Sequence, residues 1–123
     1  MPTSRSLEET GYFVVEMEEG SKAILDLAEV GPRYQPGHAH ADSLSFELSL
    51  FGHRVIVNSG TYLYGRCRER GRQRSTSAHS TVEIDQKNSS EIWSGFRVAR
   101  RAYPKAVQVT DDPEGTTTVR CSH

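Results

Sequence analysis

The clearest pattern in the chain is an alternation of apolar and polar residues over positions 44–50. Leucine and phenylalanine occupy every second position there, with serine and glutamate between them. Because side chains of a β-strand point to opposite faces in turn, this period of two predicts a strand with one buried face. Gly52 and His53 predict a turn, and the run 54–58 predicts a strand that returns beside the first.

Shorter apolar runs predict further strands on both sides of this hairpin. They cover residues 12–17, 22–28, 80–85, 96–102, 106–110 and 116–121. Runs that recur about every ten residues, with turn-forming residues between them, are typical of an all-β domain folded as an antiparallel β-sandwich or barrel. No window predicts a helix of useful length, and the arginine-rich segment 65–75 is expected to be a loop.

The length and the end of the chain bear on its domain organisation. The 123 residues suffice for one domain with one core. The last predicted strand stops within two residues of the end of the chain, where a strand needs a partner and a turn. We therefore expect residues 1–123 to form one truncated β-sandwich, incomplete on its C-terminal side.

Charge and composition restrict the partners. The formal net charge is −1, so the chain as a whole does not attract nucleic acid or an anionic membrane, and an electrostatic partner must meet a local patch. No apolar run approaches the roughly 20 residues that cross a bilayer, so we expect no membrane insertion. Cys67 and Cys121 can pair only if the fold brings them together, and their pairing stays open.

A histidine pair precedes the best-predicted strand. His38 and His40 stand two positions apart, so in extended backbone both side chains project from the same face and make half of a metal site. Asn58 ends the returning strand and His79 opens a later one, so each can approach the pair. The alternative is two solvated histidines at a junction between loop and strand. A cupin-type metal site is a further alternative, which requires Glu47 to turn toward the histidines.

Three blocks of sequence carry a more specific signal. They are Gly-His-Ala-His-Ala-Asp-Ser-Leu-Ser-Phe-Glu-Leu at 37–48, Val-Asn-Ser-Gly-Thr-Tyr at 57–62, and Arg-Ser-Thr-Ser-Ala-His-Ser-Thr-Val-Glu-Ile-Asp at 74–85. In this order, and extended by residues 89–96, they resemble the heparinase II/III-like family of polysaccharide lyases. The resemblance implies a C-terminal β-sandwich that faces an N-terminal helical α/α toroid across a substrate cleft. That helical domain is missing from the chain.

The resemblance also implies roles for individual residues. Such lyases cleave uronic-acid polysaccharides by β-elimination, which requires a base, an acid and neutralisation of the uronate carboxylate. His38 is similar to the family's sandwich-side catalytic histidine. His40 and His79 match its metal-ligand positions, and Asn58 stands where the family has aspartate. The implied cofactor is a divalent metal, zinc, which organises the loops of the cleft rather than activating a water.

Asn58 is where the chain departs from the family. An amide oxygen brings no charge and is a weaker ligand than a carboxylate, so the site is expected to bind metal weakly. Asp42 offers a replacement carboxylate, although capping the turn before the strand is an equal alternative for it.

Several aromatic and basic residues are candidates for substrate contact. By resemblance Tyr62 and Tyr64 flank the cleft, where they stack on sugar rings or lie in the core. Trp93 and Phe96 are expected in the core, with a sugar platform as the alternative. The arginines of 65–75, Arg74 among them, suit carboxylate and sulfate groups, although a solvated loop explains them equally well.

An acidic polysaccharide is therefore the expected partner, and nucleic acid is not, because no aromatic residues interleave the arginines. The chain is expected to be inactive without the helical domain. The alternative function is a non-catalytic module that binds acidic glycan or supports the assembly of surface polysaccharide, which the substitution at Asn58 favours. The resemblance implies a bacterial protein located in the periplasm or outside the cell.

Overall fold

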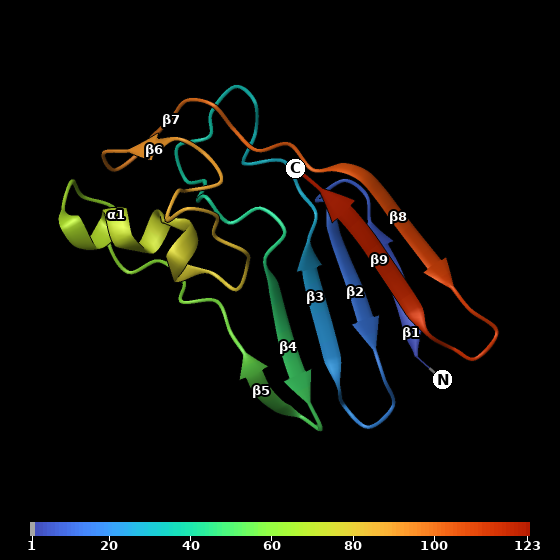
Figure 1. Ribbon diagram of the computed structural model, residues 1–123. Coiled ribbons are helices and arrows are strands. Elements are labelled where there is room, and N and C mark those ends of the chain that lie inside the picture. The colour runs from blue at the N-terminus through green and yellow to red at the C-terminus, as the bar shows by residue number, and fades with distance from the viewer. Residues whose placement is uncertain (1) are drawn as a thin grey trace.

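Five antiparallel strands form the main sheet of the computed structural model, which describes residues 2–123 (Figure 1). The strands are β1 (Thr3–Leu7), β2 (Tyr12–Glu16), β3 (Lys22–Asp26), β4 (Phe46–Leu50) and β5 (His53–Ile56). Each strand pairs with the one that follows it in the chain, so the sheet is a meander in the order β1-β2-β3-β4-β5. The connection between β3 and β4 is the long one, and it carries the histidine pair.

Burial on the main sheet is greatest at β2. Phe13 and Val14 are buried, which agrees with the aromatic and β-branched composition of that strand. Gly11, just before β2, has a φ of 77°, and a Cβ added there would lie 2.6 Å from the Cα of Ala28. Only glycine therefore allows this close approach of the two chain segments.

The predicted amphipathic strand is present as β4, but its apolar face is only partly covered. Phe46 pairs with Leu25 on β3, and Leu48 pairs with Ala23. Phe46 and Leu50 each remain 39% exposed. Within residues 2–123, this face of the sheet is therefore incompletely packed.

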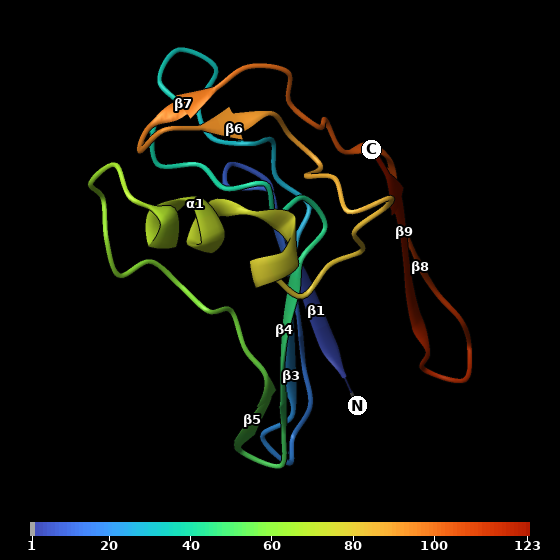
Figure 2. The ribbon, with the colours of Figure 1, turned by 60° about the vertical axis from the view of Figure 1, so that its left-hand side comes forward.

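Two small antiparallel sheets complete the strand inventory. One pairs β6 (Ile92–Trp93) with β7 (Arg97–Val98), and the other pairs β8 (Lys105–Asp111) with β9 (Thr117–Ser122). Figure 2 shows the main sheet nearly edge-on, with the β8–β9 hairpin on one side and the helical segment on the other. The prediction of an all-β, sandwich-like antiparallel domain is confirmed.

The structure differs from the sequence predictions in the segment after β5. The expected arginine loop contains a helix, α1 (Arg68–Arg74), followed by a 3₁₀ turn, η1 (Thr76–Ala78). The helix begins after Cys67, whose Sγ accepts a hydrogen bond from the backbone N–H of Arg70 at 3.4 Å. Its buried face is polar and charged, so apolar periodicity does not reveal it.

Two predicted strands are also shorter or absent. Residues 80–85 form no ladder, and only an isolated bridge joins Ile84 to Lys87. Val82 is 74% exposed, so the alternation there does not correspond to a buried face. The predicted strand 96–102 is reduced to the two residues of β7. In contrast, β1 forms without an apolar signal, through its backbone ladder with β2.

The buried residues away from β2 are mostly polar. The polar ones are Ser21, Ser43, Ser45, Arg70, Gln73, Arg74, Thr76, His79 and Ser90, and the apolar ones are Val30, Ala41 and Ala102. Both cysteines are free, Cys67 being exposed and Cys121 partly exposed. Within the described part of the chain, no helix has the length and apolar character needed to cross a membrane.

Candidate functional site

The loop 36–43 and the segment of α1 and η1 are fastened together at Ala41. The backbone N–H of Ala41 donates to the carbonyl of Arg74 at 2.9 Å. The hydroxyl of Thr76 donates to the carbonyl of Ala41 at 2.7 Å. Ala41 has no exposed surface, and these two bonds hold its neighbours His40 and Asp42 beside the segment that carries His79.

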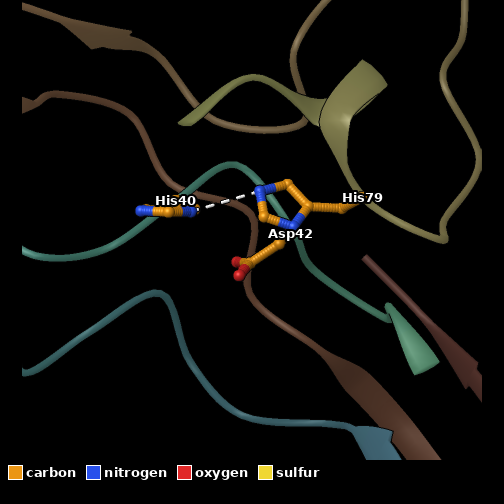
Figure 3. Close-up of side chains that lie close together, drawn as sticks. All are labelled: His40, Asp42 and His79. Atoms are coloured by element: carbon orange, nitrogen blue, oxygen red, sulfur yellow. Dashed lines mark hydrogen bonds between the residues drawn. The ribbon is translucent and has the colours of Figure 1, made fainter. Parts of the chain in front are cut away.

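His40, Asp42 and His79 converge on one point. Nδ1 of His40 lies 3.2 Å from Nε2 of His79, although the two residues are 39 positions apart. One potential ligand atom from each of the three residues lies within 4.8 Å of the other two. Figure 3 shows the two imidazole rings joined by this contact and the Asp42 carboxylate pointing into the space beside them. Two imidazoles and a carboxylate are a common ligand set for a divalent cation.

The hydrogen bonds of the two histidines are incompletely satisfied. Nε2 of His40 lies 3.1 Å from Nη1 of Arg70, which can only donate, so this contact favours a proton on Nδ1 of His40. Nε2 of His79 lies 3.1 Å from the carbonyl of Gln73, which can only accept, so this contact favours a proton on Nε2 of His79. Together, the two contacts place a proton on both of the nitrogens that face each other. The hydrogen bond between the rings would then have two donors and no acceptor.

Nδ1 of His79 is buried and has no partner among residues 2–123. Buried polar atoms in native proteins nearly always have a partner, and a bound ion is one explanation of an exception. This unpartnered nitrogen belongs to a ring that contacts His40 through Nε2 and forms one cluster with the Asp42 carboxylate, so the ligand set fits a divalent cation.

The electrostatics of the site keep the imidazole of His40 neutral. Burial lowers the pKa of His40 to about 4, and the positive charges of His79, Arg70 and Arg74 act in the same direction. A neutral imidazole is the form that binds metal. Burial raises the pKa of Asp42, and the nearby His79 opposes that shift.

His40 and Asp42 line a hollow of about 580 Å³, which we call the acidic hollow. Its charged side chains are Asp26, Glu29, Asp42 and Glu47, and no lysine or arginine lines it. Burial raises the pKa of Asp26 to about 6, although a hydrogen bond from the backbone N–H of Ala28 works against the shift. A hollow with this lining favours a cation over an anion.

Asn58 lines the acidic hollow, and its amide oxygen is already engaged. Oδ1 of Asn58 accepts a hydrogen bond from the backbone N–H of Gly60 at 2.8 Å, which closes a tight turn after β5. Glu47, which a cupin-type site requires, accepts a hydrogen bond from Nη2 of Arg54 at 2.9 Å. It lines the hollow without belonging to the three-residue cluster.

His38 lies exposed at the rim of the hollow, among aromatic rings. Its ring meets those of Tyr64 and Phe96 edge to face, at centroid distances of 5.4 and 5.8 Å. Tyr64 and Phe96 stack in parallel, 6.3 Å apart. Tyr62 is exposed, and its backbone N–H donates to Oε1 of Gln73. The structure therefore brings Tyr64 to His38, whereas Tyr62 lies apart from this aromatic group.

Arg70 joins the aromatic residues to the histidine cluster, a role that the sequence does not single out. Its guanidinium lies 5.2 Å from the ring centre of Tyr64 and 6.0 Å from that of Phe96. Nη1 contacts His40, and Nε donates to the carbonyl of Gly95. The arginine-rich composition of the segment was the available signal, but it does not distinguish Arg70 from its neighbours.

Arg74, expected to bind substrate, is fully buried. Its guanidinium donates only to backbone carbonyls, those of Ala39, Trp93, Ser94 and Arg97, at 3.0 to 3.3 Å. A side chain with no exposed surface does not reach a ligand in this conformation. Arg74 instead ties the histidine loop to the β6–β7 hairpin.

Comparison with known proteins identifies the class that this fold and site define. The family model described as "Heparinase II/III-like, C-terminal" matches residues 2–123. The chain therefore belongs to the heparinase II/III-like family. The sequence prediction of this family is confirmed.

A curated relative agrees with this assignment. The chain is 26% identical over 114 residues to a heparin-sulfate lyase of Bacteroides stercoris. The match covers 89% of the chain and only 17% of that relative, so the chain spans about a sixth of its length. No solved structure shows a significant match to the chain.

Proposed function

We propose that this domain forms one side of the active site of a lyase that cleaves uronic-acid-containing acidic polysaccharide by β-elimination. The observation that carries the proposal is the position of exposed His38 on a hollow that is also lined by His40 and Asp42, two members of the cluster that His79 completes. Membership of the heparinase II/III-like family and similarity to a heparin-sulfate lyase support it.

The chemistry assigns His38 a role at the uronate. In a β-elimination a base removes the proton from the carbon next to the carboxylate, a double bond forms to the neighbouring carbon, and the bond from that carbon to the glycosidic oxygen breaks. An acid then protonates the departing oxygen. His38, exposed and held by Tyr64 and Phe96, binds the carboxylate or moves one of these protons. We propose that the other catalytic groups, including a tyrosine, come from a helical domain of the same protein.

The proposed metal ligands are His40, His79 and Asp42, with Asn58 next to them on the wall of the acidic hollow. A bound divalent cation, zinc by its affinity for imidazole, would hold the loops in place and add positive charge near the uronate. Asp42 compensates for the carboxylate that Asn58 lacks. This assignment agrees with the neutral state of His40 and with the unpartnered nitrogen of His79.

The test of the reaction uses a protein that carries both this domain and the proposed helical domain, and it measures the ultraviolet absorbance of the unsaturated uronate formed from heparan sulfate. We expect His38→Ala to lower kcat by about 10²- to 10⁴-fold, the usual contribution of a general acid or base, with metal content unchanged. His53→Ala is the matched control, because His53 is an exposed histidine on β5 outside the cluster. Full activity of His38→Ala would contradict the proposed role.

The test of the metal site is elemental analysis of the purified protein. We expect His79→Gln to abolish bound zinc and Asp42→Asn to weaken binding strongly. Asn58→Asp should tighten binding, because it adds a negative charge beside the cluster. Unchanged zinc content in both His79→Gln and Asp42→Asn would reject the ligand set.

A second candidate is a non-catalytic module that binds acidic glycan. The observation that favours it is Asn58, whose oxygen is engaged by Gly60 rather than being a free carboxylate. This candidate predicts binding of heparan sulfate fragments without any unsaturated product, even with zinc supplied and with the helical domain present. Formation of the product excludes it.

A further inference from the structure

A second hollow lies on the other side of His38. It measures about 570 Å³, and we call it the cationic hollow. Its lining includes His38, Tyr34, Arg66, Phe96 and Arg97. These residues come from the histidine loop, the segment before α1 and the β6–β7 hairpin, which gather beyond one end of the main sheet (Figure 1).

The two hollows that share His38 carry opposite charge. The acidic hollow is lined by four carboxylates and by no lysine or arginine. The cationic hollow is lined by Arg66 and Arg97 and by no carboxylate. The lining of the cationic hollow therefore favours an anionic ligand that contacts His38.

Arg66 and Arg97 are available to a ligand, unlike most arginines of the chain. Arg33, Arg72 and Arg100 form ion pairs with glutamates. Within residues 2–123, the guanidinium groups of Arg66 and Arg97 form no ion pair or hydrogen bond, and both residues are exposed. A free guanidinium offers paired donors that match a carboxylate or a sulfate.

The same hollow presents apolar ring faces. Tyr34 is 88% exposed and Phe96 is 48% exposed. The backbone at Gly37 passes close to Phe96, since a Cβ at this glycine would lie 3.6 Å from that of Phe96. Aromatic rings next to free guanidinium groups provide both contacts that a charged sugar requires, one for its apolar face and one for its anionic substituents.

We propose that the cationic hollow binds an anionic sugar unit of the polysaccharide, with Arg66 and Arg97 contacting its carboxylate or sulfate groups. This inference rests on the proposed function and adds to it the place and the chemistry of substrate recognition. It also replaces buried Arg74 with two exposed arginines as the residues that bind substrate. His38 then lies between the bound sugar and the metal centre.

The test is calorimetric binding of a size-defined heparan sulfate oligosaccharide to the zinc-loaded protein. We expect Arg66→Gln and Arg97→Gln each to raise Kd about 10-fold, as expected for loss of a charge-assisted contact. The double variant should raise Kd about 100-fold if the two contacts act independently. Arg68→Gln is the matched control, because Arg68 is an exposed arginine of the same segment that does not line the hollow. Thermal unfolding and zinc content verify that each variant is folded.

Modified oligosaccharides identify the anion. If the variants and the wild type bind carboxyl-reduced oligosaccharide with the same Kd, the arginines contact the uronate carboxylate. If they bind desulfated oligosaccharide with the same Kd, the arginines contact sulfate. Wild-type affinity in both single variants, or an equal loss in Arg68→Gln, would overturn the proposal.

Binding and turnover separate this proposal from the proposed function. If the wild type with the helical domain present produces no unsaturated uronate but binding depends on Arg66 and Arg97, the reaction is rejected and the cationic hollow is retained. If turnover is observed and KM is unchanged in both arginine variants, the hollow is rejected and the reaction is retained.

Discussion

In the main sheet the side chains with least exposure are apolar, with Phe13 and Val14 buried on β2, whereas around α1 they are polar or charged. The sheet is held by backbone ladders and by apolar packing, which is not directional. Around α1, Arg70, Arg74 and Thr76 are held by hydrogen bonds to carbonyls and side chains from distant parts of the chain.

The difference explains why the candidate site lies at the polar region. Hydrogen bonds fix direction as well as distance, so they position individual side chains more strictly than apolar contacts do. The bonds from Thr76 and to Arg74 hold Ala41, and therefore hold His40 and Asp42 against His79. The polar region is therefore sensitive to substitution, because removing one partner leaves its hydrogen-bonded carbonyls unpaired.

The largest expected effect is that of Arg74→Met. It removes four hydrogen bonds from a buried charged donor, and hydrogen bonds to charged groups contribute about 1.5–3 kcal/mol each, so we expect a loss of about 4 kcal/mol or more. Hydrogen exchange at single residues should show faster exchange around α1 and unchanged protection in β2 and β3. Equal loss of protection in both regions would remove the distinction between them.

Phe13→Ala tests the other region. It should lower the free energy of unfolding by about 3 kcal/mol, because it leaves a cavity in the apolar part of the sheet. The zinc affinity of the folded protein should remain that of the wild type, since Phe13 takes part in neither of the two hydrogen bonds that hold Ala41. Urea denaturation and zinc titration measure the two quantities. A matching loss of zinc affinity would show that the sheet and the site are coupled.

Asp26→Asn gives a smaller effect that depends on pH. The folded-state pKa of about 6 lies above the ordinary 3.8, so Asp26 favours folding only below about pH 4, and this contribution is lost as pH rises through 6. The variant should therefore be more stable than the wild type by roughly 1–2 kcal/mol at pH 8, after allowance for partial exposure. The difference should vanish below pH 4. Denaturation in the presence of a chelator measures it without metal binding.

The smallest expected effect is that of Arg72→Ala on the exposed face of α1. Nη2 of Arg72 lies 2.7 Å from Oε1 of Glu69, three residues earlier in the helix. Exposed ion pairs contribute less than about 1 kcal/mol. We therefore expect Arg72→Ala to lower the free energy of unfolding by less than about 1 kcal/mol. A decrease above about 2 kcal/mol, well beyond this range, would mean that the exposed face of α1 supports the site as the buried face does.

Apolar patterns in the sequence predicted those strands of the main sheet whose buried residues are apolar. The runs at 12–17 and 44–50 appear as β2 and β4, and β4 pairs with β5 as expected. The same method missed α1, because its buried residues Arg70, Gln73 and Arg74 are polar. It also missed β1, because all five of its residues are exposed and only backbone bonds with β2 hold it.

The candidate site was predictable in its residue types and not in its contacts. The family motifs point to His40 and His79, but spacing in the sequence cannot show that their nitrogens lie 3.2 Å apart. Asp42 was one of two alternatives, and it is the carboxylate of the cluster. The burial of Arg74 could not be predicted because it depends on carbonyls from two segments that are distant from Arg74 in the sequence, the loop at Ala39 and the β6–β7 hairpin.

The two outer strands of the main sheet also affect how this domain behaves at high concentration. Within residues 2–123, β1 and β5 each pair on one side only, so each has backbone groups without a strand partner in this part of the chain. Arg5 lies on β1 and Arg54 on β5, and charged side chains on an edge strand disfavour the addition of a strand from a second chain. These two arginines therefore protect the sheet against aggregation, although Phe46 and Leu50 leave part of its apolar face uncovered.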